Sequence, residues 1–181
     1  MQITIITPCS RPENIKRLKE TLNFNYILEW IIVYDSSKVS KIENFNDPKI
    51  KEFLIKERGS KKGTAQRNFG ITQVKGGYVY FLDDDNILHE NFYSFLGEIV
   101  PGHIYTFNQL HQEGLRSGNV IKPYHIDTAQ YLVDFDLPGV KEILWTNTSI
   151  HDGVYIESIY NMHPNKWIFI NMTLCYHNKL N

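Results

Sequence analysis

The chain has 181 residues, of which 42% are hydrophobic and 22% charged, and its formal net charge is −1. This composition is ordinary for a globular protein, and the nearly balanced charge gives no electrostatic reason to expect binding to nucleic acid or to a membrane surface. No apolar run approaches the roughly 20 residues that a membrane-spanning helix needs. The sequence holds two cysteines, Cys9 and Cys175, and opens on a strand-like run without a basic and apolar leader, so we expect a cytoplasmic protein.

The first half of the chain alternates predicted strands and helices. Its short apolar runs predict four strands, at residues 2–7, 30–34, 50–55 and 78–82. Residues 15–22 carry hydrophobic side chains at helical spacing, and residues 65–74 also favour a helix. Ser10 and Glu13 have the spacing of a capping box, with Pro12 in the first helical turn. Apolar strands separated by helices predict an α/β domain with a mostly parallel central sheet, whose ligands bind beyond the carboxyl ends of the strands.

The second half of the chain is less regular. Residues 103–109 and 166–178 favour strands, and residues 128–133 favour a strand or a short helix. Residues 151–160 favour a helix with an apolar face. No repeat, low-complexity stretch or linker divides the sequence, so we expect one domain over residues 1–181.

Three carboxylates, Asp83, Asp84 and Asp85, directly follow the apolar run at residues 78–82. Neighbouring carboxylates repel by about 1 kcal/mol in water and by about 4 kcal/mol at an effective dielectric constant near 20, so a positive partner is expected. If the extended backbone continues, Asp83 and Asp85 share one face and can hold Mg²⁺ or Mn²⁺ together with water and substrate phosphates. The alternative is a solvated acidic turn.

Four motifs in this order resemble the GT-A fold of nucleotide-sugar-dependent glycosyltransferases: TPCSRP, WIIVYDSS, RG…QRN and YVYFLDDDN. The set is especially similar to the β-glucuronosyltransferases. The compact length, and the HDG motif before a predicted helix, are similar to small bacterial and viral GT-A enzymes. The resemblance is close over residues 1–95 and loose beyond them. It implies one Rossmann-like GT-A domain, in which residues 1–95 bind the nucleotide sugar and residues 96–181 bind the acceptor.

The resemblance implies a metal-dependent, inverting transferase. Its donor would be a nucleotide-diphosphate sugar, with UDP favoured, and its acceptor a hydroxyl of a glycan or glycoconjugate. It would act in the cytoplasm, which for a viral source means that of the host cell. Two alternatives stay open. A nucleotidyltransferase that makes sugar nucleotides should carry a glycine-rich first loop, which this chain lacks. The other alternative is a non-catalytic module that binds sugars or nucleotides.

The resemblance also implies which residues form the site. Asp85 would be the main ligand of Mn²⁺ or Mg²⁺, and Asp83 would lie near the metal and the ribose. His177 is either a further metal ligand or a surface or capping residue. Arg67, early in a helix, is expected to grip phosphate with its two-donor fork. The residues expected around the donor are Pro8, Ser10, Arg11, Asp35, Gly63, Arg67, Asn68, Asp83 and Asp84.

The catalytic base is expected in the second half of the chain. Asp152 lies at the start of a predicted helix and would take the proton from the acceptor hydroxyl; the alternative is that it is only the helix cap. Asp127 and Glu157 are the reserve candidates. Trp145 could stack on an acceptor sugar or lie in the core. Asp35 could likewise cap a turn instead of contacting the nucleotide base.

Overall fold

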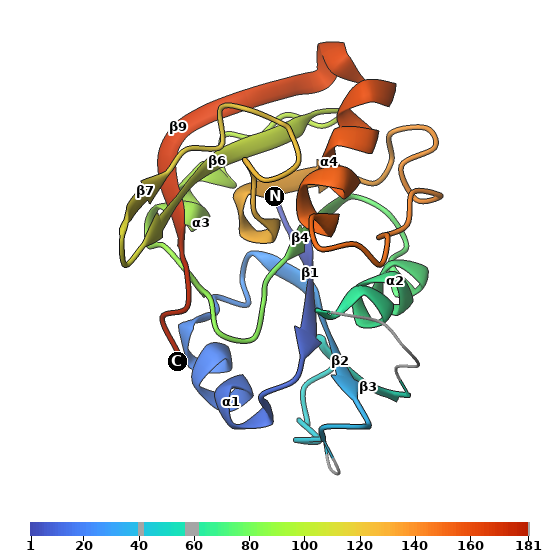
Figure 1. Ribbon diagram of the computed structural model, residues 1–181. Helices are drawn as coiled ribbons and strands as arrows, with labels where there is room; N and C mark the ends of the chain where they lie inside the picture. The colour runs from blue at the N-terminus through green and yellow to red at the C-terminus, as the bar shows by residue number, and fades with distance from the viewer. Residues whose placement is uncertain (40–41, 57–61, 181) are drawn as a thin grey trace.

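The computed structural model describes residues 1–39, 42–56 and 62–180 (Figure 1). In this part of the chain, nine strands form one continuous sheet. The strands are β1 (Ile3–Cys9), β2 (Ile27–Asp35), β3 (Ile50–Ile55), β4 (Tyr78–Phe81), β5 (Ile87–Leu88), β6 (Ile104–His111), β7 (Gly114–Arg116), β8 (Tyr131–Asp134) and β9 (Trp167–Tyr176). The helices are α1 (Pro12–Thr21), α2 (Thr64–Gln73), α3 (Asn91–Phe95) and α4 (His151–Met162), with the short 3₁₀ helices η1 (Thr128–Gln130) and η2 (Pro164–Lys166). None of the helices in the described residues combines the length and apolarity needed to cross a membrane.

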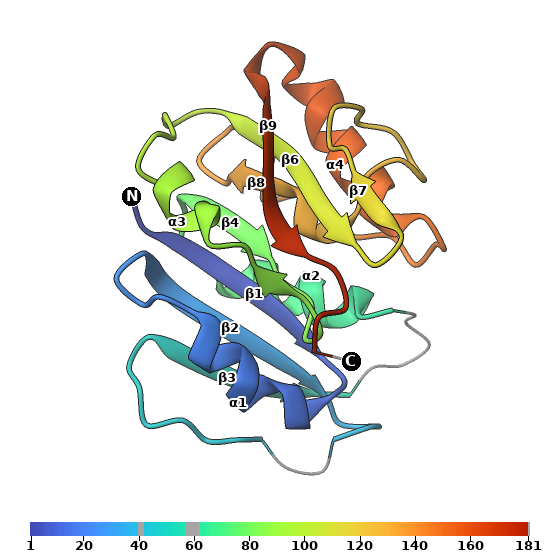
Figure 2. The same ribbon diagram turned by 90° about the vertical axis from the view of Figure 1, so that its left-hand side faces the viewer.

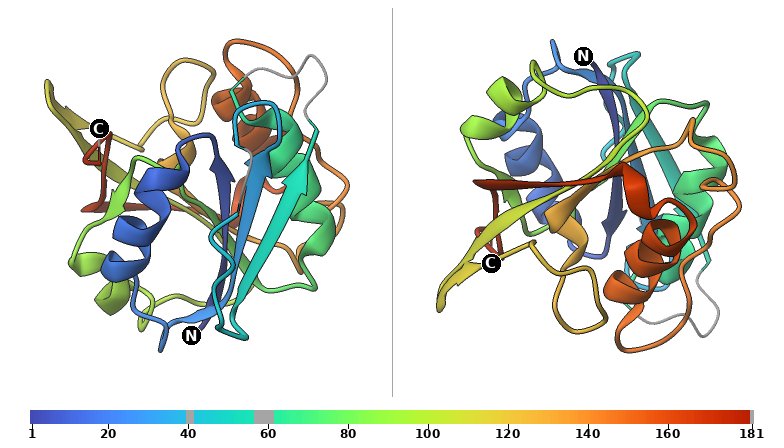
Figure 3. Two further views of the ribbon diagram at one scale, coloured as in Figure 1. Left: turned by 90° about the horizontal axis from the view of Figure 1, so that it is seen from below. Right: turned by 90° about the horizontal axis from the view of Figure 1, so that it is seen from above.

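The first four strands form the parallel part of the sheet, in the order β3-β2-β1-β4. Helices cover both faces of these strands, with α1 and α3 on one side and α2 and α4 on the other (Figures 2 and 3). Successive residues of β1 therefore face opposite helices: Ile5 packs in the core on the α1 side and Ile6 in the core on the α2 side. The prediction of an α/β domain with apolar strands buried on both faces is confirmed.

The second half of the chain makes the sheet mixed rather than mostly parallel. Strand β8 runs antiparallel to β4, β6 runs antiparallel to β8, and β9 returns parallel to β6 after helix α4. Residues 128–133 form both alternatives that the sequence left open. The carboxylate of Asp127 and the amide side chain of Gln130 make a capping box that closes η1, and β8 follows at once.

The start of α1 differs from its prediction. The helix begins at Pro12 as expected, but its N-cap is Arg11 and no side chain caps it. Ser10 donates its backbone N–H to Asp84 Oδ2 at 2.6 Å and its hydroxyl to the same oxygen at 3.3 Å. The predicted capping box of Ser10 and Glu13 is therefore wrong, because Ser10 is drawn to a carboxylate from a distant strand end.

Candidate active site

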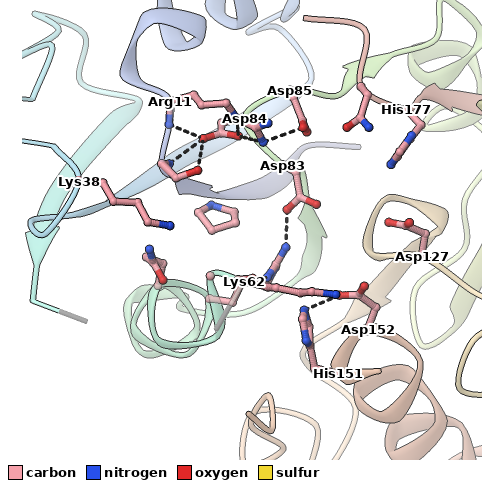
Figure 4. Close-up of a pocket in the computed structure, with 16 residues that line it drawn as sticks. Arg11, Lys38, Lys62, Asp83, Asp84, Asp85, Asp127, His151, Asp152 and His177 are labelled. Carbon is pink, nitrogen blue, oxygen red and sulfur yellow. Dashed lines mark hydrogen bonds and ion pairs between the residues drawn. The ribbon is translucent and has the colours of Figure 1, made fainter. Parts of the chain in front are cut away.

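A pocket of about 230 Å³ opens beyond the carboxyl ends of β1 and β4 (Figure 4). Eleven predicted residues line it: Pro8, Ser10, Arg11, Gly63, Arg67, Asp83, Asp84, Asp85, Asp127, Asp152 and His177. Five further residues complete the lining: Lys38, Lys62, Gln66, His151 and Asn178. The two halves of the chain thus meet at one polar pocket, as expected for a ligand site at strand ends.

The turn at Asp84 and Asp85 is held by Arg11. Arg11 donates from Nε and Nη2 to Asp84 Oδ1, at 2.9 and 2.6 Å, and its Nη2 lies 2.6 Å from Asp85 Oδ2. The backbone N–H groups of Ser10 and Arg11 donate to Asp84 Oδ2, at 2.6 and 2.8 Å. Asp84 is only 1% exposed, and both its oxygens are used inside the protein. Asp84 thus fastens the β1–α1 loop to the end of β4, and its place at the donor stays a prediction.

Asp83 faces a different arginine. Its Oδ1 contacts Arg67 Nη2, and Arg67 Nη1 donates to the Lys62 carbonyl oxygen at 2.6 Å. Strand β4 ends at Phe81, and the chain turns so that Asn86 N–H donates to the Asp83 carbonyl oxygen at 3.1 Å. The predicted shared face of Asp83 and Asp85 is therefore wrong, because the backbone turns instead of staying extended (Figure 4).

Asp152 lies inside the first turn of α4, whose N-cap is Ile150. Its Oδ1 accepts a hydrogen bond from the Thr128 hydroxyl at 2.6 Å and lies 3.1 Å from His151 Nε2. Burial alone would raise the pKa of Asp152, but the contact with His151 and the charge of Arg67 lower it below its ordinary value. The alternative that Asp152 is only the helix cap is therefore wrong, because Ile150 is the N-cap and Asp152 lines the pocket.

His177 and Asp127 occupy a third side of the pocket (Figure 4). His177 follows β9, and its ring stacks on that of His111 with centroids 4.1 Å apart. Burial and the neighbouring His177 lower the pKa of His111 to about 4. Asp127 pairs with Arg116 at 3.2 Å, and burial and the charge of Asp152 raise the pKa of Asp127. The reserve base is thus held by an arginine, whereas Asp152 is held by a hydroxyl and a histidine.

Three predicted site residues do not line the pocket. Asp35 accepts hydrogen bonds from the N–H and hydroxyl of Ser37, at 2.8 and 2.7 Å, so it is the turn cap that the sequence left open. Asn68 exchanges two hydrogen bonds with the backbone of Trp145, at 3.0 and 2.8 Å, which corrects its predicted place at the donor. Trp145 is 3% exposed and stacks on Tyr155 with centroids 4.6 Å apart. It lies in the core and offers no platform to an acceptor.

The pocket's carboxylates could hold a metal ion only with help from a ligand. Within residues 1–39, 42–56 and 62–180, no cluster of three or more His, Cys, Asp or Glu side chains could hold a metal by itself. Mg²⁺ and Mn²⁺ often take one or two carboxylates and complete their shell with water and substrate phosphates. The carboxylate of Asp85 lies on the pocket wall and offers the oxygen ligands that these metals prefer, and His177 lines the same pocket. These residues fit a metal that arrives with a diphosphate.

Some pocket residues were missed by sequence reasoning. Lys38 follows the polar end of β2 and Asn178 follows β9, so their places at strand ends were the available signals. For His151 the available signal was its place directly before Asp152 in the sequence. Lys61, which precedes Lys62 in the sequence, lies outside the described residues.

Known proteins share the sequence pattern and the fold of this chain. The sequence model of glycosyl transferase family 2 matches residues 4–110, more than half of the chain. Among solved structures, Staphylococcus aureus TarS 1–349 superposes with a TM-score of 0.75 at 16% identity, covering 98% of this chain and 60% of that one. The same protein in complex with UDP gives a TM-score of 0.71 at 16% identity, with the same coverages. Its complex with UDP-GlcNAc gives 0.69 at 13% identity, covering 98% of this chain and 58% of that one. No match was found among curated proteins.

The family match and the structural matches agree on the fold of the chain. At such low identity the structural match shows the architecture alone, and together with the family match it confirms the predicted GT-A-like α/β fold. The chain spans about 60% of the length of TarS 1–349. The finer resemblance to β-glucuronosyltransferases stays a prediction.

Proposed function

Since the chain belongs to glycosyl transferase family 2, we propose that it transfers a sugar from a UDP-linked donor to a hydroxyl of a glycan or glycoconjugate, with inversion and with a divalent metal. One observation carries the proposal: Asp85 and Asp152 lie on opposite walls of one pocket (Figure 4). An inverting transfer needs this separation, because the base and the leaving diphosphate act on opposite faces of the sugar. The UDP and UDP-GlcNAc complexes of TarS support UDP as the nucleotide.

The donor is expected on the wall that carries Asp85. Lys38, Lys62 and Arg11 line the same pocket, and their positive charges suit a diphosphate. Asp85 and His177 would hold the metal, which would stabilise the charge that develops on the leaving diphosphate as a Lewis acid. Arg67 is buried and committed to Asp83, so we expect it to fix that carboxylate rather than to grip phosphate.

The acceptor hydroxyl is expected beside Asp152. One of its oxygens is bound by Thr128 and His151, and the described residues provide no hydrogen-bond partner for the other. That second oxygen would take the proton of the acceptor hydroxyl. The acceptor oxygen then bonds to the anomeric carbon while the bond to the diphosphate breaks, and the diphosphate leaves with the electron pair.

The donor half of the proposal is tested by thermal unfolding with UDP and Mn²⁺. A ligand at a hundred times its dissociation constant adds about 2.7 kcal/mol of stability. We expect UDP and Mn²⁺ together to raise the melting temperature more than UDP alone, and Asp85→Asn to lose the metal-dependent part. Asp136→Asn is the matched control, because this exposed carboxyl lies beyond β8 at the opposite end of the sheet. Equal metal-dependent shifts in Asp85→Asn and the wild-type protein would remove Asp85 from the metal site.

The catalytic half is tested by Asp152→Asn. The amide keeps the shape of the side chain but cannot take a proton, so turnover should fall by about 10²–10⁴-fold while UDP affinity stays near that of the wild type. The assay is slow hydrolysis of a UDP-sugar panel, with UDP and free sugar as products. Release of pyrophosphate from a nucleoside triphosphate and a sugar phosphate would instead indicate a nucleotidyltransferase.

A further inference from the structure

The ring of His151 is buried between two oxygen atoms. It is 2% exposed, with Nδ1 2.7 Å from the Thr148 carbonyl oxygen and Nε2 3.1 Å from Asp152 Oδ1 (Figure 4). The Trp145 ring flanks it at a centroid distance of 5.5 Å. Both ring nitrogens therefore face atoms that are hydrogen-bond acceptors, unless the carboxyl itself carries a proton.

These two contacts fix the number of protons in the group. A carbonyl oxygen only accepts, so Nδ1 must carry a hydrogen. A neutral imidazole has one N–H, and its Nε2 would then turn a lone pair toward the carboxylate of Asp152, which is repulsive. One additional proton must lie between Nε2 and Oδ1. The same oxygen already accepts a hydrogen bond from the Thr128 hydroxyl, as an ionised carboxylate does readily.

We propose that His151 is a positioning residue for the base: its doubly protonated ring holds Asp152 ionised and oriented, and this hold is lost when the ring gives up its proton. The proposal rests on the role of Asp152 in the proposed function. We call His151 and Asp152 the proton-sharing pair.

Charged groups of both signs surround the proton-sharing pair. Arg67 of α2 approaches it with positive charge, whereas Asp83 after β4 and Asp127 before η1 approach it with negative charge. Arg67 already contacts Asp83, and Arg116 already pairs with Asp127. Lys62 lines the same pocket with a further positive charge (Figure 4). The buried hydroxyl of Tyr131, on β8, is another titratable neighbour, and burial raises its pKa well above the ordinary value. Arg67 and Arg116 each pair with another carboxylate, whereas the ring of His151 lies at ion-pair distance from Asp152.

The proton-sharing pair predicts two ionisations in the rate. Turnover falls at low pH, when the carboxylate of Asp152 is protonated. It also falls at high pH, when the neutral ring of His151 repels the carboxylate and displaces its free oxygen from the acceptor. A displacement of about 1 Å can cost about 10²-fold in rate.

The first test is nuclear magnetic resonance of the free protein with ¹⁵N-labelled histidine, so it depends on no donor or activity. At about pH 7.5 we expect both ring nitrogens of His151 to carry hydrogens in the wild-type protein. In Asp152→Asn, whose amide can donate to Nε2, we expect one. The spectrum of His151→Gln assigns the signals. A wild-type ring with a bare Nε2, or an Asp152→Asn ring that stays doubly protonated, overturns the proposal.

The second test separates the two contacts of the ring with amide isosteres. The amide nitrogen of glutamine reaches about as far as Nε2 and can donate to Asp152 without titrating. That of asparagine reaches about as far as Nδ1 and can serve only Thr148. We expect His151→Gln to keep turnover within about tenfold and to lose the alkaline fall in rate, and His151→Asn to lose about 10²-fold.

The assay for this second test is hydrolysis of whichever UDP-sugar the wild-type protein turns over fastest, with UDP affinity and melting temperature as controls for folding. Equal losses in His151→Gln and His151→Asn, or an alkaline fall that persists in His151→Gln, overturn the proposal. If the wild-type protein neither binds UDP nor hydrolyses any UDP-sugar, the proposed function fails, and the resonance experiment still decides the protonation of the pair.

Discussion

Asp83, Asp84 and Asp85 follow one another in sequence, yet each has a different environment. Asp84 is buried and fully used by the β1–α1 loop, Asp83 contacts the buried Arg67, and Asp85 pairs with the half-exposed Arg11. The repulsion expected of three adjacent carboxylates is therefore offset by two arginines from different elements. The side chain of Arg11 is 37% exposed, whereas that of Arg67 is buried and both oxygens of Asp84 are already used, so we expect Asp85 to be the one of the three carboxylates that binds a cation.

Asp83 is the member of this group whose ionisation is costly. Burial, followed by the charges of Asp152, Asp127 and Asp85, outweighs Arg67 and raises the pKa of Asp83 to about 7. In an unfolded chain an aspartate titrates near 3.9. Between about pH 4 and 7 the folded protein therefore binds more protons than the unfolded chain, and its stability falls as the pH rises through that window.

Asp83→Asn should remove this part of the pH dependence. The titrating group is gone, so the free energy of unfolding of the variant should fall less between about pH 4.5 and 7, by up to about 1.4 kcal/mol for each pH unit. Urea unfolding at several pH values measures it. Loss of the partner of Arg67 lowers the stability of the variant at every pH, so the slope, and not the level, is the readout. Identical slopes in the two proteins would contradict the raised pKa.

At the scale of elements, α2 is the part that joins the parallel strands to the second half of the chain. It packs closely on β1, where a Cβ on Gly70 would lie 2.5 Å from Cγ2 of Ile6. Asn68, on the same helix, holds the backbone of Trp145, whose ring lies 4.6 Å from the Arg67 guanidinium carbon. The packing of α2 on β1 thus fixes the backbone of Arg67, and the Trp145 ring that Asn68 holds packs on its guanidinium group. Arg67 in turn holds the carboxylate of Asp83.

Asn68→Ala should loosen this arrangement. It leaves the N–H and carbonyl groups of Trp145 without their partner, which typically costs about 1–3 kcal/mol. Chemical unfolding measures the loss of stability. Thr72→Ala is the matched control, because its exposed hydroxyl bonds only within the same helix, donating to the carbonyl oxygen of Phe69 and accepting from Nε2 of Gln73. A loss no larger than that of the control would show that Asn68 does not pin the helix.

The same residues show what the sequence could predict. Strands β1 to β4 and helix α2 are recorded in local patterns of apolar residues, so their positions were predicted closely, and β3 matches at both ends. The partners of polar side chains are not local: Arg11 and Asp84 lie 73 positions apart, and Asn68 and Trp145 lie 77 positions apart. The sequence therefore predicted which residues gather at the strand ends, but not which of them bind each other.

At the scale of the whole molecule, the C-terminal segment completes the carboxylate turn that belongs to the first half. The N–H of Leu180 donates to the Asp85 carbonyl oxygen at 3.0 Å, and the N–H of Asn178 donates to Asn86 Oδ1 at 2.8 Å. These partners are also distant in sequence, 92 positions apart for Asn178 and Asn86. The turn that carries the candidate metal ligand is thus built from both halves, so we do not expect the halves to be independent folding units.

This coupling predicts a single cooperative unfolding transition. The sheet is continuous from β3 to β9 through the pairing of β4 with β8, so melting either half exposes a buried strand edge of the other. Tryptophan fluorescence can report on each half separately. Trp30 lies in β2, bonded through Nε1 to Thr7 Oγ1 at 2.9 Å, whereas Trp145 and Trp167 lie in the second half.

The measurement compares two single-half reporters, Trp30→Phe and the double variant Trp145→Phe with Trp167→Phe. Each substitution shifts stability by its own amount, so the fluorescence midpoint of each variant is compared with the circular dichroism midpoint of the same variant. We expect the two midpoints to coincide in both proteins, since a two-state transition gives one midpoint to every probe. UDP with Mn²⁺, if it binds between the halves, should move both probes together. A fluorescence transition that precedes loss of secondary structure in either variant would show that residues 1–95 and 96–181 unfold separately, and that the pocket between them is an interface of two domains.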